Sequence, residues 1–366
     1  KIYFYSSNKM SRVCDPAGHK FIPVEVEDFD IYTGIYKILA AIKPDWPQEN
    51  IKFKIFTDGI TNKLVACQLD PANNLGSNEN VVLVRIYGNK TDLLIDRNAE
   101  VRNITVLNKA GLAPKIYGVF KNGLSYEYYP GVTLDTDTVA DAKISRLVAQ
   151  QMAKMHKIQL GEEVPREPMV WDKIEQFLSL IPEKFTDASK HARFTSSFGS
   201  ITRLRIEYER LKSHLVKTES PIVFAHNDLL LGNVIYDESK GTVSFIDYEY
   251  ASYNYQAYDI ANHFNEFVGI SIENMDYSRY PSKDFQINWI RIYLAEFLDN
   301  PTPSQELIEE IYKDVQRLSL ASNFKWGIWS LVQFELSDID FDFGRYAEMR
   351  LNRYFEEKNA VYKELL

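Results

Sequence analysis

The residues best suited to chemistry lie in two neighbouring segments, 223–236 (V-F-A-H-N-D-L-L-L-G-N-V-I-Y) and 243–250 (V-S-F-I-D-Y-E-Y). Four polar residues interrupt these otherwise apolar segments: His226, Asp228, Asn233 and Asp247. Burying even a neutral polar group without a partner costs about 2–7 kcal/mol, and burying a charge costs more. These side chains therefore need a charged ligand or a metal ion. A strand–loop–strand hairpin over 222–250 would bring Asp228 opposite Asp247.

Glycine-rich phosphate-binding motifs do not account for this chemistry. The 16 glycines include no G-x-G arrangement, and the sequence contains no G-x-x-x-x-G-K-[ST]. The chain therefore lacks a dinucleotide-binding fingerprint and a Walker loop, and any phosphate must be bound in another way.

The spacing of the acidic residues resembles that of the kinase superfamily. Its catalytic loop has the sequence H-R-D-x-x-x-x-N and precedes an Asp-Phe-Gly segment. Here Asn233 follows Asp228 by five residues, and Asp247 follows it by nineteen. The resemblance implies that Asp228 accepts the proton of a substrate hydroxyl, whereas Asn233 and Asp247 bind Mg²⁺ on the phosphates of ATP. Any one of these residues alone could cap a turn, but all three are present, which favours a catalyst over a pseudokinase or scaffold.

A longer set of motifs is similar to the choline and ethanolamine kinase family. Its clearest part is I-D-Y-E-Y-A-S-Y-N-Y-Q-A-Y-D-I-A-N-H-F-N-E-F at 246–267. Shorter matches occur at 56–64, 82–88, 113–118 and 326–330. The resemblance extends from about Phe56 to Tyr354.

The resemblance implies an α+β, bilobal protein-kinase-like fold. Residues 1–130 would form a small, β-rich N-terminal lobe that covers the nucleotide and contains one long helix. Residues 131–366 would form a larger, mainly helical C-terminal lobe with the catalytic loop and an amine pocket. ATP and Mg²⁺ are the implied cofactors, and ATP would lie between Arg85 and Asp247.

The resemblance assigns ATP binding mainly to the N-terminal lobe. The residues concerned are Gly59, Ile60, Thr61, Asn62, Arg85, Glu100, Glu127, Tyr128 and Tyr129, together with Asp247. Gly59 to Asn62 form a turn whose backbone N–H groups can approach phosphates, although a plain hairpin turn is the alternative. Arg85 lies in an apolar strand and needs a partner, for which Glu100 is the natural candidate unless it belongs to a solvated helix face. Glu127 to Pro130 would be the hinge that hydrogen-bonds the adenine.

The phosphate acceptor in this family is a small amino alcohol, so the resemblance also implies a pocket for a cation. Trp326, Trp329 and Tyr346 would line it with aromatic faces, and Asp228 would meet the hydroxyl. Glu266 would supply a carboxylate for the ammonium group. Without the resemblance, the tryptophans would indicate a core stripe of one helix. Two further residues would support the site from behind: His226 and Glu249, the latter bracing the metal or the catalytic loop.

Hydrogen-bond acceptors distinguish the two amines, because ethanolamine presents three N–H donors and choline none. Leu230, F-I-D-Y-E-Y at 245–250 and Asn265 beside Glu266 resemble the ethanolamine branch, whereas Gly232 is a choline-branch feature. The expected reaction is the ATP-dependent phosphorylation of ethanolamine to phosphoethanolamine, the first step of phosphatidylethanolamine synthesis by the CDP-ethanolamine route. A choline kinase or a dual kinase is the alternative. An aminoglycoside-type phosphotransferase shares H-x-D-x-x-x-x-N, but its acceptor site is rich in carboxylates rather than paired tryptophans.

Composition excludes several other classes of function. The net charge of −9 disfavours nucleic-acid binding. Two cysteines, Cys14 and Cys67, are too few for a zinc quartet or a disulfide framework. No apolar stretch approaches the roughly 18 residues of a membrane span, so we expect no integral membrane segment and a cytoplasmic location. A homodimer remains open as an assembly.

Strands and helices must position these residues. Alternating apolar residues predict strands at 51–57, 63–69, 81–87, 115–121 and 124–129. A helix of about five turns is expected from Thr91, as its N-cap, to Gly111. Periods of 3.6 residues predict further helices at 139–158, 171–180, 201–216, 285–297, 304–333 and 339–354.

Overall fold

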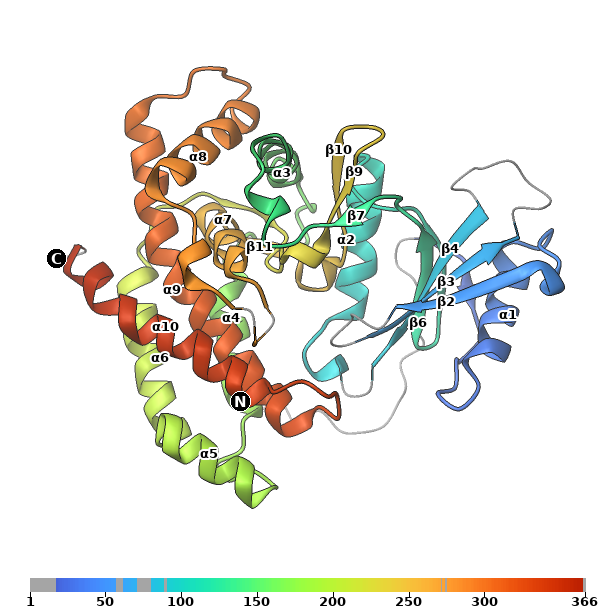
Figure 1. Cartoon of the computed structure of the whole chain (residues 1–366), viewed down its shortest axis with the longest axis horizontal. Helices are drawn as coiled ribbons and strands as arrows, with labels where there is room; N and C mark the ends of the chain where they lie inside the picture. Colours follow the sequence, from blue (N-terminus) through green and yellow to red (C-terminus); the bar gives the residue numbers. More distant parts are fainter. Residues whose placement is uncertain are drawn as a thin grey trace. The chain divides into compact units, whose positions relative to one another are not determined.

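A six-stranded sheet organises the first part of the computed structural model, which describes residues 18–56, 62–70, 80–88, 91–270, 272–273 and 275–364 (Figure 1). The chain divides into two compact units, one ending at Pro130 and one beginning at Gly131. The sheet lies in the first unit and has the strand order β1-β5-β6-β4-β3-β2. Its strands are β1 (Phe21–Ile22), β2 (Ile51–Phe56), β3 (Asn62–Leu69), β4 (Val81–Tyr87), β5 (Ile116–Phe120) and β6 (Gly123–Glu127). β1 runs parallel to β5, and the other neighbouring pairs are antiparallel.

The five predicted strands are confirmed to within two residues at each described end, and Thr57 lies outside the described residues. Helix α1 (Ile31–Ile42) packs on this sheet and was not expected from the sequence. Its Ile35 and Ile38 are buried with Val65 and Val84 of the strands. Ile31, Ile35, Ile38 and Ile42 have helical spacing, so the sequence carries a signal for this helix that the predicted elements left out.

The next helix begins later than the sequence predicts. Thr91–Leu93 form a short 3-10 turn, and α2 spans Arg97–Lys109. The N-cap is Asp96, whose carboxylate accepts hydrogen bonds from the N–H groups of residues 98 and 99. Thr91 instead accepts a hydrogen bond from Arg97 Nη2 (2.7 Å), so the prediction of Thr91 as N-cap was wrong. Gly111, at φ +74°, follows the end of the helix as predicted.

Helices dominate the second unit, as predicted (Figure 1). They are α3 (Ala142–His156), α4 (Met169–Leu180), α5 (Ala188–Phe198), α6 (Ile201–Leu215), α7 (Gln256–Asn265), α8 (Lys283–Phe297), α9 (Gln305–Leu336) and α10 (Phe343–Glu364). Two small sheets, β10-β9-β7 and β11-β8, accompany them. Their strands are β7 (Val132–Thr133), β8 (Ile222–Ala225), β9 (Val234–Asp237), β10 (Thr242–Phe245) and β11 (Ser252–Tyr255). Across the described part of the chain, the helices are too short or too polar to cross a membrane.

Helix α9 packs against α4, α7, α8 and α10 and is buried over most of its second half. A glycine in that half, Gly327, permits the close approach of α10, because a Cβ there would lie 2.5 Å from Leu351 Cγ. The predicted 304–333 helix is confirmed and extends to Leu336. The predicted 339–354 helix begins later, at Phe343, and runs to Glu364.

Helix α5 is the element of this unit that periodicity misses. Only Phe194 and Phe198 of its eleven residues are buried, so its sequence shows no apolar stripe. The helix depends instead on its N-cap, Asp187, which accepts hydrogen bonds from the N–H groups of Ser189 and Lys190.

Replacing Asp96 by alanine tests where α2 begins. Loss of the N-cap should lower the free energy of unfolding by about 1 kcal/mol, because two helix N–H groups lose their acceptor. Urea denaturation measures this change, and Asp92→Ala is the matched control, since Asp92 lies in the 3-10 turn with its side chain 83% exposed. A larger loss of stability for Asp92→Ala than for Asp96→Ala would contradict a helix that begins after Asp96.

Candidate active site

The loop at 226–233 connects β8 to β9, and Asp247 follows β10. The β9–β10 pair aligns Val234 with Phe245, and the N–H of Ile246 donates to the carbonyl oxygen of Asn233 (3.0 Å). The side-chain Nδ2 of Asn233 donates to the carbonyl oxygen of Asp228 (2.8 Å). These bonds bring Asp228, Asn233 and Asp247 together at one end of the hairpin.

A buried carboxylate on α7 fixes the start of this loop. Asp259 Oδ2 accepts from the N–H of His226 (2.8 Å), and Oδ1 accepts from the N–H of Asn227 (2.7 Å). His156 Nε2 lies 2.9 Å from Oδ2 and carries the proton of this bond, because a carboxylate only accepts. Burial raises the pKa of Asp259, but the His156 hydrogen bond and the other donors outweigh it and hold the pKa below its ordinary value.

His226 connects the loop to the residue before Asp247. Its ring Nε2 donates to the carbonyl oxygen of Ile246 (2.9 Å), and burial lowers the pKa of the imidazole. The buried His226 ring therefore ties the loop to Ile246, whereas its role in supporting the active site stays a prediction.

Two non-glycine residues of this site have a left-handed backbone: Asn227 and Asp247, both at φ +64°. This conformation costs on the order of 1 kcal/mol and persists only where the surroundings impose it. The Asn227 amide donates to the carbonyl oxygens of Tyr250 (3.1 Å) and Ser252 (3.2 Å). Its Oδ1 accepts from Asn254 Nδ2 (2.7 Å). Asn227 therefore fixes the backbone immediately before Asp228.

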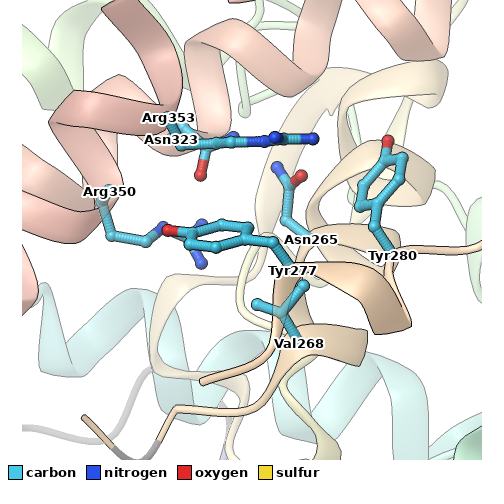
Figure 2. Close-up of a pocket in the computed structure, with 7 residues that line it drawn as sticks. All are labelled: Asn265, Val268, Tyr277, Tyr280, Asn323, Arg350 and Arg353. Carbon is cyan, nitrogen blue, oxygen red and sulfur yellow. The ribbon is translucent and has the colours of Figure 1, made fainter. Parts of the chain in front are cut away.

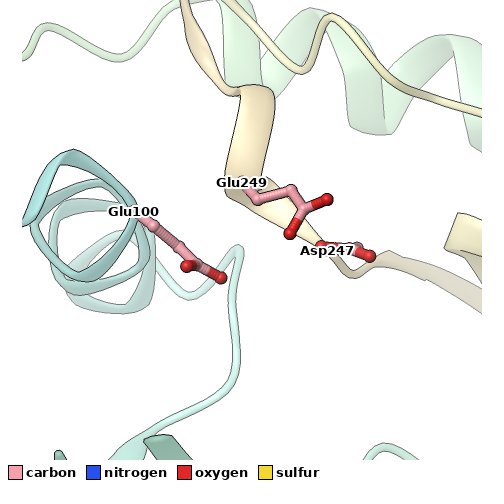
Figure 3. A group of neighbouring side chains, drawn as sticks. All are labelled: Glu100, Asp247 and Glu249. Atoms are coloured by element: carbon pink, nitrogen blue, oxygen red, sulfur yellow. The ribbon is translucent and has the colours of Figure 1, made fainter. Parts of the chain in front are cut away.

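Acidic groups crowd around the half-buried Asp228. Desolvation raises the pKa of this carboxyl well above its ordinary value. The positive charge of Lys325 acts against this rise, whereas the negative charges of Asp247, Glu249 and Glu266 add to it. Carboxylate oxygens of Asp247 and Glu249 lie within 4.8 Å of each other (Figure 3). Together with the Asn233 amide oxygen they are the hard oxygen donors that Mg²⁺ prefers, so these residues fit a magnesium site.

The predicted amine-binding tryptophans lie in a buried aromatic cluster. The Trp326 ring is 5.6 Å from that of Trp329 and 5.5 Å from that of Tyr250, both edge to face. Trp326 Nε1 donates to Asn262 Oδ1 (2.7 Å), and Trp329 Nε1 donates to the Tyr250 hydroxyl (2.9 Å). Tyr346, on α10, is buried as well. A stripe of core residues on one helix would also have buried rings. The role of these three residues in amine binding therefore stays a prediction.

A lysine that the sequence reasoning missed lies in this cluster. Lys325 is fully buried, and its Nζ is 4.0 Å from the centroid of the Trp326 ring and 5.0 Å from that of Tyr250. Nζ also donates to the carbonyl oxygen of Asn227 (3.2 Å). Burial lowers the pKa of Lys325 to about 7, although the charge of Asp228 acts in the opposite direction.

Glu266, predicted to bind the substrate ammonium, already has a protein cation beside it. Arg350 Nη1 donates to Glu266 Oε1 (2.9 Å), and both side chains are buried. Asn265, expected to assist Glu266, accepts a hydrogen bond from Ser319 Oγ (2.9 Å). The roles of Glu266 and Asn265 in amine binding stay predictions, and a bound amine would share Glu266 with Arg350.

A pocket next to this ion pair is lined by Asn265, Val268, Tyr277, Tyr280, Asn323, Arg350 and Arg353 (Figure 2). The guanidinium carbon of Arg353 is 5.1 Å from the centroid of the Tyr277 ring. Because two guanidinium groups line the pocket, it suits an anion better than an ammonium group. We therefore do not place the amine there.

In the first unit, Glu100 on α2 (drawn in Figure 3) is fully buried and pairs with two arginines. Arg85 Nη1 donates to Oε1 (2.9 Å), and Arg97 Nη1 donates to Oε2 (3.0 Å). The predicted Arg85–Glu100 pair is confirmed, and the alternative of a solvated helix face was wrong. Arg97, which was not predicted, also donates to Asn62 Oδ1 (3.3 Å).

The structure gives less information about the other residues predicted to bind ATP. Gly59, Ile60 and Thr61 lie outside the described residues, and Asn62 begins β3. The N–H of Glu127 donates to the carbonyl oxygen of Lys115 (2.9 Å), so this group is used within its own unit. Burial and the charge of Glu127 raise the pKa of Tyr129 to about 12. The ATP-binding roles of Glu127, Tyr128 and Tyr129 stay predictions.

Comparison with known proteins identifies the family. The family model described as "Choline/ethanolamine kinase" matches residues 53–355. The chain belongs to the choline/ethanolamine kinase family. It is 42% identical to "Ethanolamine kinase" of Drosophila melanogaster (92% of this chain, 79% of that protein). It is also 42% identical to "Ethanolamine kinase 1" of Homo sapiens (94% and 77%). A solved structure of Plasmodium vivax ethanolamine kinase matches with a TM-score of 0.77 at 30% identity, over 90% of this chain and 89% of that one.

Membership in the choline/ethanolamine kinase family confirms the predicted α+β, protein-kinase-like fold. Three residues that shape the site escape sequence reasoning: Asn227, Lys325 and Arg350. A signal existed for Lys325, because it is a lone cation in the apolar run F-K-W-G-I-W at 324–329. Arg350 follows Tyr346 by four residues on α10, which places both on one helix face.

Replacing Asp259 by asparagine tests the loop anchor. In the variant, an NH2 group replaces one of the two accepting oxygens and faces the donors that this oxygen served. The free energy of unfolding should therefore fall by about 3 kcal/mol. Because the folded-state pKa of Asp259 is lowered, its contribution is complete above about pH 4 and is lost as pH falls further. The difference in unfolding free energy between wild type and Asp259→Asn should therefore shrink below about pH 4. Asp299→Asn, at a side chain 84% exposed, is the control; an equal effect of the two variants would remove Asp259 as the anchor.

Proposed function

We propose that this member of the choline/ethanolamine kinase family transfers the γ-phosphoryl group of ATP to the hydroxyl of ethanolamine, giving phosphoethanolamine. The observation that carries the proposal is the position of Asp228 beside Asn233 and Asp247, in a chain 42% identical to two proteins named ethanolamine kinases. The fold supports a phosphotransferase, and the names of these relatives support the choice of amine.

Asp228 would accept the proton of the substrate hydroxyl as the hydroxyl oxygen attacks the γ-phosphorus, while the bond from that phosphorus to the β,γ-bridging oxygen breaks and ADP leaves. Desolvation raises the pKa of Asp228 well above its ordinary value, which makes its carboxylate a stronger base. The anchor at Asp259 and the left-handed backbone of Asn227 would hold the carboxylate in position, so that little reorganisation is needed during the reaction.

Asn233 and Asp247 would hold Mg²⁺, and Glu249 would brace the site. When bound, Mg²⁺ neutralises charge on the β- and γ-phosphates. The Nδ2 of Asn233 is engaged by the carbonyl oxygen of Asp228, which orients the amide and directs Oδ1 away from that bond. In the first unit, Arg85 would bind phosphate oxygens, and Glu100 would hold its guanidinium in place.

A dual choline and ethanolamine kinase is the second candidate. The aromatic cluster of Tyr250, Trp326 and Trp329 favours it, because aromatic faces attract a quaternary ammonium group without any N–H donor. A cytoplasmic location, a homodimer and a place in the CDP-ethanolamine route stay predictions from the sequence.

Replacing Asp228 by asparagine should lower kcat for ethanolamine by about 10²- to 10⁴-fold, the usual contribution of a general base. ATP affinity should change little, whereas Asp247→Ala should weaken ATP binding in the presence of Mg²⁺. A phosphate-transfer assay and nucleotide titration measure the two effects. Asp237→Asn, at the far end of the same hairpin, is the control. Near-normal turnover of Asp228→Asn would show that another group accepts the proton.

The Glu266–Arg350 pair allows structure and amine binding to be separated. Glu266→Gln should lower the free energy of unfolding by about 3 kcal/mol, because the buried Arg350 loses its partner. The double variant Glu266→Gln/Arg350→Met should recover most of this loss. If Glu266 also binds the ammonium, both variants lose kcat/KM for ethanolamine more than for choline. A stable double variant with unchanged preference would place Glu266 outside the amine site.

A further inference from the structure

Lys325 has no part in the phosphate chemistry proposed above, yet it is fully buried in the middle of α9. Lysine is almost never fully buried unless its charge is compensated. Its Nζ donates to the carbonyl oxygen of Asn227 (3.2 Å), the residue before Asp228. The ammonium group is therefore held at the catalytic loop rather than directed to solvent.

The rest of its environment is aromatic. Nζ lies 4.0 Å from the ring centroid of Trp326, 5.0 Å from that of Tyr250 and 5.8 Å from that of Tyr258. These distances are within the roughly 6 Å at which a cation interacts with a ring face. Hydrogen bonds from Trp326 to Asn262 and from Trp329 to Tyr250 fix two of the rings. The cluster is thus a cation-binding site that a side chain of the protein already occupies.

We propose that Lys325 is a specificity-determining residue: its ammonium group occupies the faces of Trp326 and Tyr250 and excludes quaternary ammonium compounds. The proposal deepens the proposed function and rests on it, because it takes Trp326 to face the substrate amine. A quaternary ammonium group has no N–H and depends on ring faces, so it must displace Lys325. A primary ammonium group has N–H donors and can bind through hydrogen bonds to carboxylates, which does not require the ring faces that Lys325 occupies. The side chain therefore selects ethanolamine by filling the site that choline needs.

Tetramethylammonium is a suitable probe, since it lacks both N–H groups and a hydroxyl. Lys325→Met removes the charge at similar length, and Lys325→Gln removes it while keeping a donor for the carbonyl oxygen of Asn227. Lys325→Arg keeps the charge. Lys283→Met is the matched control, because Lys283 Nζ lies 5.1 Å from the ring centroid of Tyr312, outside the cluster, and its side chain is 57% exposed.

Calorimetry should show that Lys325→Met and Lys325→Gln bind tetramethylammonium at least tenfold more tightly than wild type. The ratio of kcat/KM for choline to that for ethanolamine should rise at least tenfold in the same variants. Lys325→Arg and Lys283→Met should stay within about threefold of wild type in both measurements.

Equal tetramethylammonium affinity in wild type and in a folded neutral variant would overturn the proposal. Tight binding of tetramethylammonium to wild type, in competition with ethanolamine, would overturn it whether or not the variants fold. Calorimetric binding needs no phosphate transfer, so the two proposals fail separately. A wild type that phosphorylates neither amine contradicts the proposed function, whereas the calorimetry still decides whether Lys325 occupies the cluster.

Discussion

Both oxygens of the buried Asp259 carboxylate accept hydrogen bonds from backbone N–H groups of the loop that leads to Asp228. Separating α7 from this loop would leave a buried charge and two buried donors without partners, at a cost of several kcal/mol. The same loop is held further along by the left-handed turn at Asn227 and by the hydrogen bond from Asn233 to the carbonyl oxygen of Asp228. The geometry of the proposed general base and metal ligands therefore depends on this one carboxylate.

The second constraint is charge. Among the described residues of the second unit, five carboxylates act on or near the site: Asp228, Asp247, Glu249, Asp259 and Glu266. Two buried cations of the same unit, Lys325 and Arg350, lie beside them. Arg350 is committed to Glu266, whereas Lys325 lies between the catalytic loop and the aromatic cluster. The remaining negative charge suits Mg²⁺ and an ammonium substrate, the two kinds of cation in the proposed function.

Much of the candidate site could be predicted from the sequence, because its polar and charged residues stand among apolar neighbours. Asp228, Asn233 and Asp247 interrupt otherwise apolar segments of the sequence, and Arg85 in an apolar strand correctly indicated Glu100 as its partner. The start of α2 could not be predicted, since Thr91 and Asp96 are both good N-caps and only the bond from Arg97 to Thr91 separates them. The pairing of Arg350 with Glu266 spans 84 residues, and no local pattern encodes such a contact.

Internal competition between the two amines tests both the kinase activity and the preferred substrate in one experiment. The wild-type protein would be incubated with ATP, Mg²⁺ and equal concentrations of ethanolamine and choline, and the products would be resolved by phosphorus NMR. We expect phosphoethanolamine as the main product, and product formation by the Asp228→Asn variant should be at least about 100-fold slower. Phosphocholine as the main product would contradict the proposed substrate, and the absence of both products would contradict the kinase activity itself.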